Sequence, residues 1–415
     1  MKERGPIIRL LPFWLFVFLF KFGAGLHYTL LPVLGGRVMP IWAVGLVIGA
    51  ASFLQLIFDV PAGVLLDRFG YVRILRIATE IFLVGALVLV LGLSLPTFLI
   101  TVFLGFLGWL FFGPGIAAYT LVNAEKGKGG RYMGLLHSFS SLGVVYATIG
   151  MVFITNQSYQ LMGVVIALLL IASTAALLFT RSDKTSVKEV SYNWKNYHIK
   201  QNYFHQTIAT IKYLNPAALM LAIQNFVSSL FYGIIWFTVP LVIAHQASSG
   251  VLGIGLGMFD LAIVVLGAVL GKYADRTDKK KMIFLGLFIF ATSAVLLGFN
   301  LNILFILFGF LATAGDEMSL TSLWSWYERI SKKHNEDGKV SGVITLFEDM
   351  GWTIGPIVAG FLYVLIGPSV TIIIAALPLV LFMLFSVIFL HGKTLPPGSL
   401  GDAVPDRPNR LRHKS

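Results

Sequence analysis

The sequence has no cysteine and little charge. Without cysteine, the 415 residues can form neither disulfides nor thiolate metal sites, although the redox compartment stays undetermined. Only 12% of the residues are charged, about half the share of roughly 25% in ordinary soluble domains. Hydrophobic residues make up 57% of the chain, and its mean hydropathy is +0.84. This composition is typical of a polytopic membrane protein.

Signatures of common enzyme sites are also missing. The eight histidines show no metal-ligand spacing, and no glycine-rich loop is placed to hold a phosphate. The sequence therefore predicts no enzyme, no bound cofactor and no metal. No nucleotide-binding segment is present either, so the sequence gives no sign of a process driven by ATP.

Twelve apolar runs are long enough to cross a bilayer, which takes about 20 residues in a helix. The sequence thus predicts an all-α membrane protein with twelve transmembrane helices. The expected spans are residues 8–34, 41–66, 74–93, 97–123, 132–155, 160–180, 216–245, 250–272, 281–299, 302–327, 340–366 and 369–391.

The positive charge falls on one side of these spans. Of the 31 lysines and arginines, only Arg37 lies in a loop on the opposite side, and Lys21 lies inside the first span. The positive-inside rule then predicts that both termini are cytoplasmic, in a cell membrane that we take to be a prokaryotic inner membrane. Topology and anionic lipid account for the formal charge of +12, so no nucleic-acid partner is expected.

Four regions follow from this layout. We expect an N-terminal six-helix bundle at 1–180, a cytoplasmic linker at 181–215, a C-terminal six-helix bundle at 216–391 and a disordered cytoplasmic tail at 392–415. The linker mixes aromatic residues with lysines, which fits either a segment at the lipid headgroups or a solvated connection. The loops on the other side are too short to form a binding domain.

A loop motif occurs twice, 208 residues apart. Residues 63–73 read GVLLDRFGYVR, and residues 271–281 read GKYADRTDKKK. In each copy an aspartate follows the glycine by four residues, an arginine by five and a base by ten. The residues of this predicted gate motif are Gly63, Asp67, Arg68, Gly70, Arg73, Gly271, Asp275 and Arg276.

The repeated loop resembles the signature loop of the major facilitator superfamily of secondary transporters. The resemblance covers essentially the whole chain, since the fifth and eleventh spans align at the same offset. It implies two six-helix halves, with the substrate site between them near the middle of the membrane. It also implies a cytoplasmic latch for the outward-open state, with Asp67 bonding the N-terminal end of the eleventh span.

Other segments are similar to family motifs, with one departure. Asp59–Gly63 looks like the acidic-x-Pro-x-Gly segment before the loop, and Gly351–Gly360 is similar to a motif of drug–proton antiporters. Gly113–Ala118 resembles the end of another motif, but Trp109 stands where that family has arginine. Because that arginine is associated with proton coupling, the departure argues against a standard drug–proton antiport mechanism.

Ionisable residues inside a span are costly, so their positions point to function. Spans six, nine and twelve contain none, and the resemblance implies that the third helix of each triplet is peripheral. The candidates for proton coupling or for lining the cavity are Lys21, Asp260, Asp316, Glu317, Glu348 and Asp349. We expect Lys21 and the acids of spans ten and eleven to share the central cavity, where one carboxylate would bind and release a proton. A fixed ion pair tying the halves together is the structural alternative, and Asp260 fits a helix-tying hydrogen bond equally well.

A polar and aromatic stripe runs along the seventh span at helical spacing. It could line the cavity or form hydrogen bonds between helices. Its predicted cavity residues are Asn225, Ser229, Tyr232 and Trp236, to which span four adds Trp109 and Tyr119. His27 is read as a structural or interfacial histidine.

The sequence therefore predicts a secondary active transporter that moves a small molecule by alternating access and is coupled to protons. Its expected partners are this substrate, protons and the lipid bilayer, and the protein is expected to be a monomer. Alternatives are an uncoupled facilitative uniporter, a drug or metabolite efflux antiporter, and a membrane sensor on the same fold. The charge of the substrate stays open, because Lys21 would admit an anion and the acids a cation.

Overall fold

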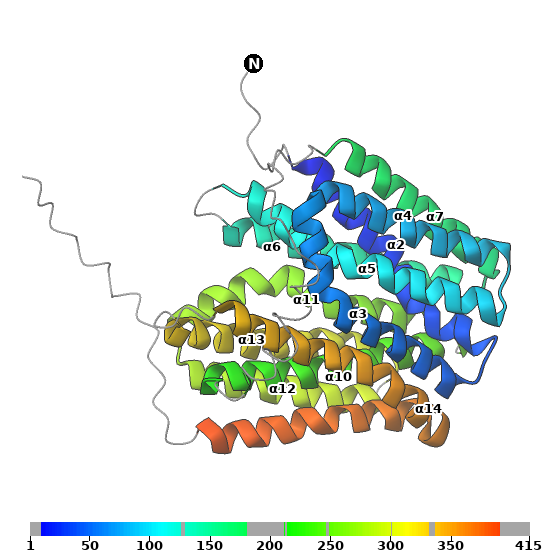
Figure 1. The fold of residues 1–415 in the computed structure, drawn as a ribbon. Helices are drawn as coiled ribbons and strands as arrows, with labels where there is room; N and C mark the ends of the chain where they lie inside the picture. Colours follow the sequence, from blue (N-terminus) through cyan, green and yellow to red (C-terminus); the bar gives the residue numbers. More distant parts are fainter. Residues whose placement is uncertain are drawn as a thin grey trace, which may run out of the picture.

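The computed structural model describes residues 10–125, 129–180, 211, 214–245, 249–299, 301–331 and 337–390. The predicted tail and almost all of the predicted linker lie outside these residues. Throughout the described residues, the regular structure is helical (Figure 1). The helices are α2 (Leu11–Gly36), α3 (Ile41–Phe69), α4 (Tyr71–Leu91), α5 (Leu95–Asn123), α6 (Gly129–Ile154), α7 (Tyr159–Leu178), α10 (Pro216–His245), α11 (Ser249–Arg276), α12 (Lys279–Phe299), α13 (Leu304–Ser331) and α14 (Asp337–Leu390).

Eleven of these helices are long and apolar enough to cross a membrane, and α14 counts for two spans. Its 54 residues would extend about 80 Å if straight, far more than a hydrocarbon core of about 30 Å. The chain reverses at Gly367, whose φ of 78° lies in the left-handed region, and Pro368 follows. In Figure 1 the orange part of α14 runs out to this turn and the red part returns. The twelve predicted spans are confirmed, with ends shifted by a few residues.

The two ends of the bundle differ in their loops. We call "basic end" the end at which α2 begins, Gly70 joins α3 to α4, and α14 finishes. We call "short-loop end" the opposite one, where α2 meets α3 and Gly367 turns the chain. The loops rich in lysine and arginine connect helices at the basic end.

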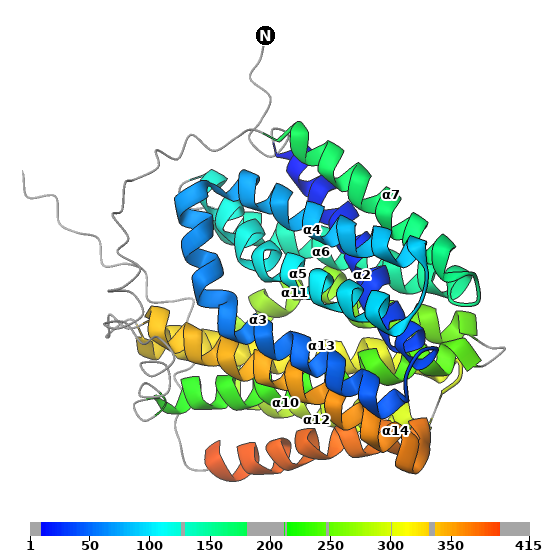
Figure 2. The same cartoon turned by 45° about the vertical axis from the view of Figure 1, so that its right-hand side comes forward.

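The helices form two groups, α2–α7 and α10–α14 (Figures 1 and 2). Between the groups, α3 packs on α14, α6 on α11 and α2 on α10. The 208-residue repeat relates the first two of these contacts, because it places span two on span eight and span five on span eleven. The α3–α14 and α6–α11 contacts between the two halves are therefore related by pseudo-symmetry.

Apolar side chains cover the outside of the molecule. On the last span, Leu377, Leu381, Leu384 and Ile388 recur at helical spacing, and each is at least 51% exposed. Peripheral α7 shows a similar exposed stripe at Leu161, Leu168 and Ile171. A soluble protein would not expose such continuous stripes, whereas lipid chains match them. By contrast, most of central α10 is buried.

Candidate functional site

A cavity of about 420 Å³ lies between the two halves at the middle of the helices. This volume is within the range of about 300–1,000 Å³ typical of small-molecule sites. Its walls come from α2, α3, α4, α5 and α6 on one side and from α10, α11, α13 and the first span of α14 on the other. The described parts of α7, α12 and the last span add no lining residue, and α4 adds only Phe82.

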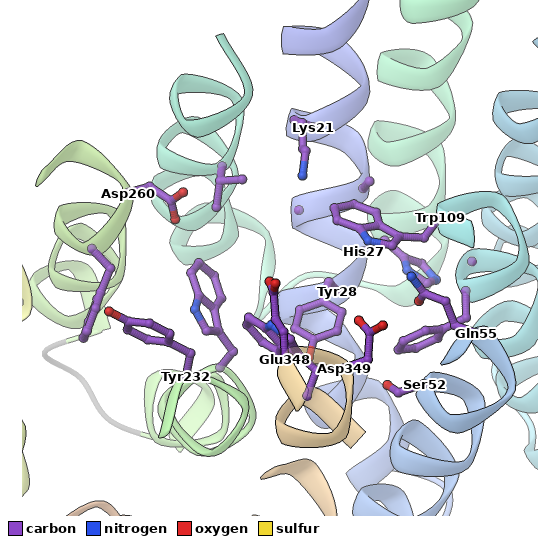
Figure 3. A pocket seen from close by; sticks show the side chains of 18 of the residues that line it. Lys21, His27, Tyr28, Ser52, Gln55, Trp109, Tyr232, Asp260, Glu348 and Asp349 are labelled. Carbon is purple, nitrogen blue, oxygen red and sulfur yellow. The ribbon is translucent and has the colours of Figure 1, made fainter. Parts of the chain in front are cut away.

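All six charged candidates line this one cavity: Lys21, Asp260, Asp316, Glu317, Glu348 and Asp349. Lys21 comes from α2, in the first half. The five acids come from α11, α13 and α14, in the second half. In Figure 3, Lys21 points into the space from one wall, while Glu348 and Asp349 point into it from the other. The cavity thus has a basic wall and an acidic wall.

Lys21 lies against aromatic rings. Its Nζ lies 4.1 Å from the centroid of the Trp109 ring on α5 and 5.8 Å from that of Phe112. This geometry is that of a cation–π contact, which stabilises an ammonium group by roughly 0.5–2 kcal/mol. Gly143 on α6 allows the approach on the other side, since a Cβ there would lie 2.7 Å from the Lys21 Cβ. A positively charged group therefore lies beside Trp109, although it is Lys21 of α2 and not an arginine at position 109 of α5.

Asp316 is held by donors from its own half. It accepts hydrogen bonds from Gln224 Nε2, Ser228 Oγ and Tyr232 Oη of α10, each at 2.9 Å. The amide of Gln224 also contacts Ser319 Oγ at 2.5 Å, so the network ties α10 to α13. Charged hydrogen bonds of this kind are worth about 1.5–3 kcal/mol each. The structural alternative, a fixed ion pair of Lys21 with one of the cavity acids, is not seen for Asp316, whose described partners are these α10 side chains.

Three of the six predicted substrate-cavity residues lie on the cavity wall: Trp109, Tyr232 and Trp236. The described cavity lining does not include Asn225, Ser229 or Tyr119, contrary to the prediction. The Asn225 amide bonds Leu221 O of its own helix, and Ser229 packs against Gly351 of α14. Tyr119 is buried among aromatic rings, 4.3 Å from the ring of Phe13.

Other residues line the cavity that the sequence patterns did not single out. Tyr28 follows Lys21 by two helical turns, and Trp352 follows Glu348 by one, so helical periodicity could have found both. Gln55 is a polar residue inside span two. His27, read as structural or interfacial, lines the cavity with a buried ring whose Nε2 has no hydrogen-bond partner within the described structure. Gly105 provides the space for this imidazole, because a Cβ there would overlap the ring.

At the short-loop end, glycines bring the halves into contact. A Cβ on Gly45 of α3 would overlap the carbonyl oxygen of Pro356 and lie 3.2 Å from Gly360 on α14. Exactly 208 residues later, a Cβ on Gly253 of α11 would overlap Val152 and lie 3.0 Å from the Thr148 carbonyl on α6. Small residues allow such close helix contacts in membranes. Two equivalent glycine contacts therefore join the halves at this end.

At the basic end, the glycines of the same four helices make no such contact with described residues. A Cβ on Gly63 of α3, Gly134 of α6, Gly267 of α11 or Gly342 of α14 would meet no described atom within 4 Å. The side chains of α3 near this end are correspondingly exposed, with Ile57 and Phe58 at 49% and 50%. Among the described residues, the two halves are therefore in glycine contact at the short-loop end, and the basic end shows no equivalent contact.

The gate motif lies at the basic end. Gly70 turns the chain between α3 and α4 with a φ of 87°, and Arg68 and Arg73 are exposed. The Arg68 guanidinium lies 5.3 Å from the centroid of the neighbouring Phe69 ring. The side chains of Asp67, Gly271, Asp275 and Arg276 lie outside the described residues, so the predicted bond from Asp67 stays a prediction.

The family model of the Major Facilitator Superfamily matches residues 13–210 and 221–412. The chain belongs to this superfamily. It is thus a multi-pass membrane protein of a transporter family, and the predictions of family and fold class and of a protein that is not an enzyme are confirmed.

Relatives of known sequence carry the same family assignment. An uncharacterized MFS-type transporter of Methanocaldococcus jannaschii is 23% identical over 78% of this chain and 83% of its own. An uncharacterized MFS-type transporter of Mycobacterium tuberculosis is 32% identical, over 37% of this chain and 34% of its own. The latter match therefore covers about a third of each protein.

Solved structures share the fold. A POT family transporter in complex with a thioalcohol-conjugated peptide superposes with a TM-score of 0.72 and 12% identity, covering 92% of this chain and 95% of the other. The nucleoside transporter NupG gives a TM-score of 0.69 and 12% identity, covering 94% and 100%. At such identities the likeness extends to the fold and leaves the substrate open.

Proposed function

We propose that the chain is a proton-coupled secondary transporter that carries a small molecule by alternating access. The observation that carries this proposal is the opposite packing of the two ends of α3, α6, α11 and α14 around one charged cavity. In a carrier of two rocking halves, the site is reached from one end while the other is sealed. The present structure fits the state that is open toward the basic end.

The positive-inside rule supports a cytoplasmic position for the basic end. We therefore assign the structure to the cytoplasm-facing state of a monomer in a prokaryotic inner membrane. In this assignment the gate motif of residues 63–73 is disengaged. It would close against the second half when the short-loop end opens, with Asp67 at the start of α14. If Asp67→Asn slows transport and leaves substrate selectivity unchanged, this role is supported; altered selectivity would contradict it.

Proton coupling is proposed for the acidic wall. A carboxylate in a water-poor cavity can bind a proton in one state and release it in the other, because its surroundings change as the halves rock. Glu317, Glu348, Asp349 and Asp260 line the cavity in this state. Asp316 also lines it, but its three donors from α10 fit a role in positioning that wall.

The test is uptake into proteoliposomes under an imposed pH gradient, with anionic, cationic and neutral metabolites as candidate substrates. We expect uptake that follows the gradient and is accompanied by proton movement. Glu348→Gln and Asp349→Asn should each reduce proton-driven accumulation by about tenfold or more while leaving exchange of the substrate across the membrane. The exposed Asp278→Asn at the basic end is the matched control. Uptake that ignores the gradient would overturn the coupling.

An uncoupled uniporter is the second candidate. The hydrogen bonds of Asp316 favour it, because they give this buried acid a structural task within one half. In that case amide variants of all five lining acids would equilibrate the substrate as the wild type does, and none would change its accumulation. The same vesicles distinguish the two candidates.

A further inference from the structure

The two walls of the cavity have charges of opposite sign. The first half contributes the ammonium group of Lys21, and the second half contributes five carboxyl groups. These groups do not alternate around the cavity, since each sign belongs to one half of the protein. A ligand between the walls therefore meets a positive group on one side and a negative surface on the other.

Lys21 is available to an anionic group. Its described contacts are the aromatic faces of Trp109 and Phe112, which leave its N–H donors without an anionic acceptor. Among the described residues, no carboxylate oxygen lies within the 4.0 Å of an ion pair with its Nζ. Asp260 is the acid whose charge acts on it, from α11 across the cavity. An ammonium group at this depth is costly unless an anion compensates it.

The acidic wall holds five carboxyl groups, opposite the single ammonium group of Lys21. Asp316 already accepts three hydrogen bonds from α10. Glu348 and Asp349 are adjacent on α14, and Figure 3 shows both carboxylates pointing toward the side from which Lys21 projects. Their position allows them to receive a cationic group of a ligand whose anionic group contacts Lys21.

Between the walls, the lining is aromatic. Large aromatic rings surround the 420 Å³ space, and they belong to Tyr28, Phe106, Trp109, Trp236 and Trp352. Such faces suit an apolar or aromatic body, and they also attract cationic groups through their π-electrons. The cavity thus combines a basic wall, an acidic wall and an apolar lining between them.

We propose that the transported substrate is a zwitterion, a small molecule that carries a carboxylate and an amino group on a compact, partly apolar body. Its carboxylate contacts Lys21 on the first half, and its amino group contacts Glu348 and Asp349 on the second. Amino acids and short peptides belong to this chemical class. Such a substrate brings no net charge into the membrane, contacts both walls at once and links the two halves. The inference rests on the proposed function, because it takes this cavity to be the transport site.

The test is binding to the purified full-length protein, followed by thermal unfolding, with matched sets of ligands. One set is L-phenylalanine, phenethylamine and 3-phenylpropanoate, which share a body and differ in their charged groups. A second set is γ-aminobutyrate, butylamine and butyrate, and a third is Ala-Phe with its amide and its N-acetyl derivative. In at least one set, the zwitterion should bind about tenfold or more tightly than both single-charge analogues, as one charged hydrogen bond predicts.

Variants of the lining residues test which cavity wall binds which charged group of the ligand. Lys21→Met should remove the advantage of the zwitterion over the amine, while the double variant Glu348→Gln/Asp349→Asn should remove its advantage over the acid. The exposed Lys281→Met is the matched control and should keep the wild-type pattern. If the wild type binds no zwitterion, or binds an amine or an acid as tightly in every set, the substrate class is wrong. If the zwitterion keeps both advantages in the variants, the assignment of the residues is wrong.

The outcomes separate this inference from the proposed function. Preferential binding of a zwitterion, together with uptake that ignores the pH gradient, would uphold the substrate class and overturn the coupling. Proton-driven uptake of an amine that lacks a carboxylate, without uptake of its zwitterion, would uphold the coupling and overturn the substrate class.

Discussion

The two ends of helices α3, α6, α11 and α14 contrast sharply. At the short-loop end, Gly45 and Gly253 bring backbones from opposite halves into contact. At the basic end, Gly63 and Gly134 on the same helices face open space. The glycine content is similar at both ends, so composition does not decide which end is closed. We propose that the tilt of the two halves does, and that a tilt in the other direction exchanges the roles of the ends.

The largest effect is expected where the closed end is overfilled. Gly253→Val would force a branched side chain into Val152 and the Thr148 carbonyl. Overpacking of this kind costs about 1–3 kcal/mol, which would shift the balance between the two states about 5–150-fold. The measurement is the labelling of a single cysteine, Ser52→Cys, on the cavity wall with a membrane-impermeant maleimide. Labelling should fall from the basic end and rise from the short-loop end.

The control for that variant lies one helical turn away. Gly250→Val is on the same helix at the same end, and a Cβ there would meet no described atom within 4 Å. Its labelling pattern should match that of the protein with Ser52→Cys alone. Equal shifts in the two variants would show that the glycine contact does not set the closed state.

A smaller effect should reveal the symmetry of the closed end. Gly45→Ala and Gly253→Ala add one methyl group at equivalent contacts of the repeat, so each should shift the labelling ratio in the same direction and by a similar factor. The two sites lie in different interfaces, and their free-energy effects should add within about 0.5 kcal/mol. Opposite shifts would mean that the two interfaces do not close together.

The Asp316 network should act within one half. Tyr232→Phe removes one of its three donors and should lower the stability of the protein by about 1.5–3 kcal/mol. Because the network joins α10 to α13 and crosses no interface between halves, the labelling ratio should stay unchanged. Thermal unfolding and labelling test both parts, with the exposed Tyr146→Phe as a control. A changed ratio with unchanged stability would place Asp316 in the gate.

The smallest effect is expected at the open end. Gly134→Ala on α6 meets open space in this state and should change the unfolding temperature and the labelling from the basic end little, apart from a helix-propensity gain of up to about 1 kcal/mol. A strong loss of stability would contradict the separation of the helices at this end.

Much of the architecture could be predicted from the sequence because bilayer thickness fixes helix length. The runs of apolar residues gave the spans to within a few residues, and the spacing of charges placed Lys21 and the acids at one depth. Helical periodicity alone could not tell which face of α10 meets the cavity. Asn225 and Ser229 share the stripe with Tyr232, yet they bond their own helix or pack on α14.

The state of the gate could not be predicted in the same way. The 208-residue offset relates Gly45 to Gly253, so the equivalent pair was readable in the sequence. Whether these glycines touch the other half depends on the relative tilt of the halves, which is a property of tertiary packing. The hydrogen bonds of Asp316 likewise depend on how α10 and α13 face each other.

The central claim is that the short-loop end has to open for transport, and a disulfide across it tests this most directly. In the pair Val152→Cys/Gly253→Cys, the Cβ atoms would lie 3.6 Å apart, within the range for a disulfide, and the native chain adds no cysteine to the background. Oxidation should reduce uptake of the identified substrate to background, and a reductant should restore it, while each single variant stays insensitive to both. Full uptake by the cross-linked protein would contradict the account.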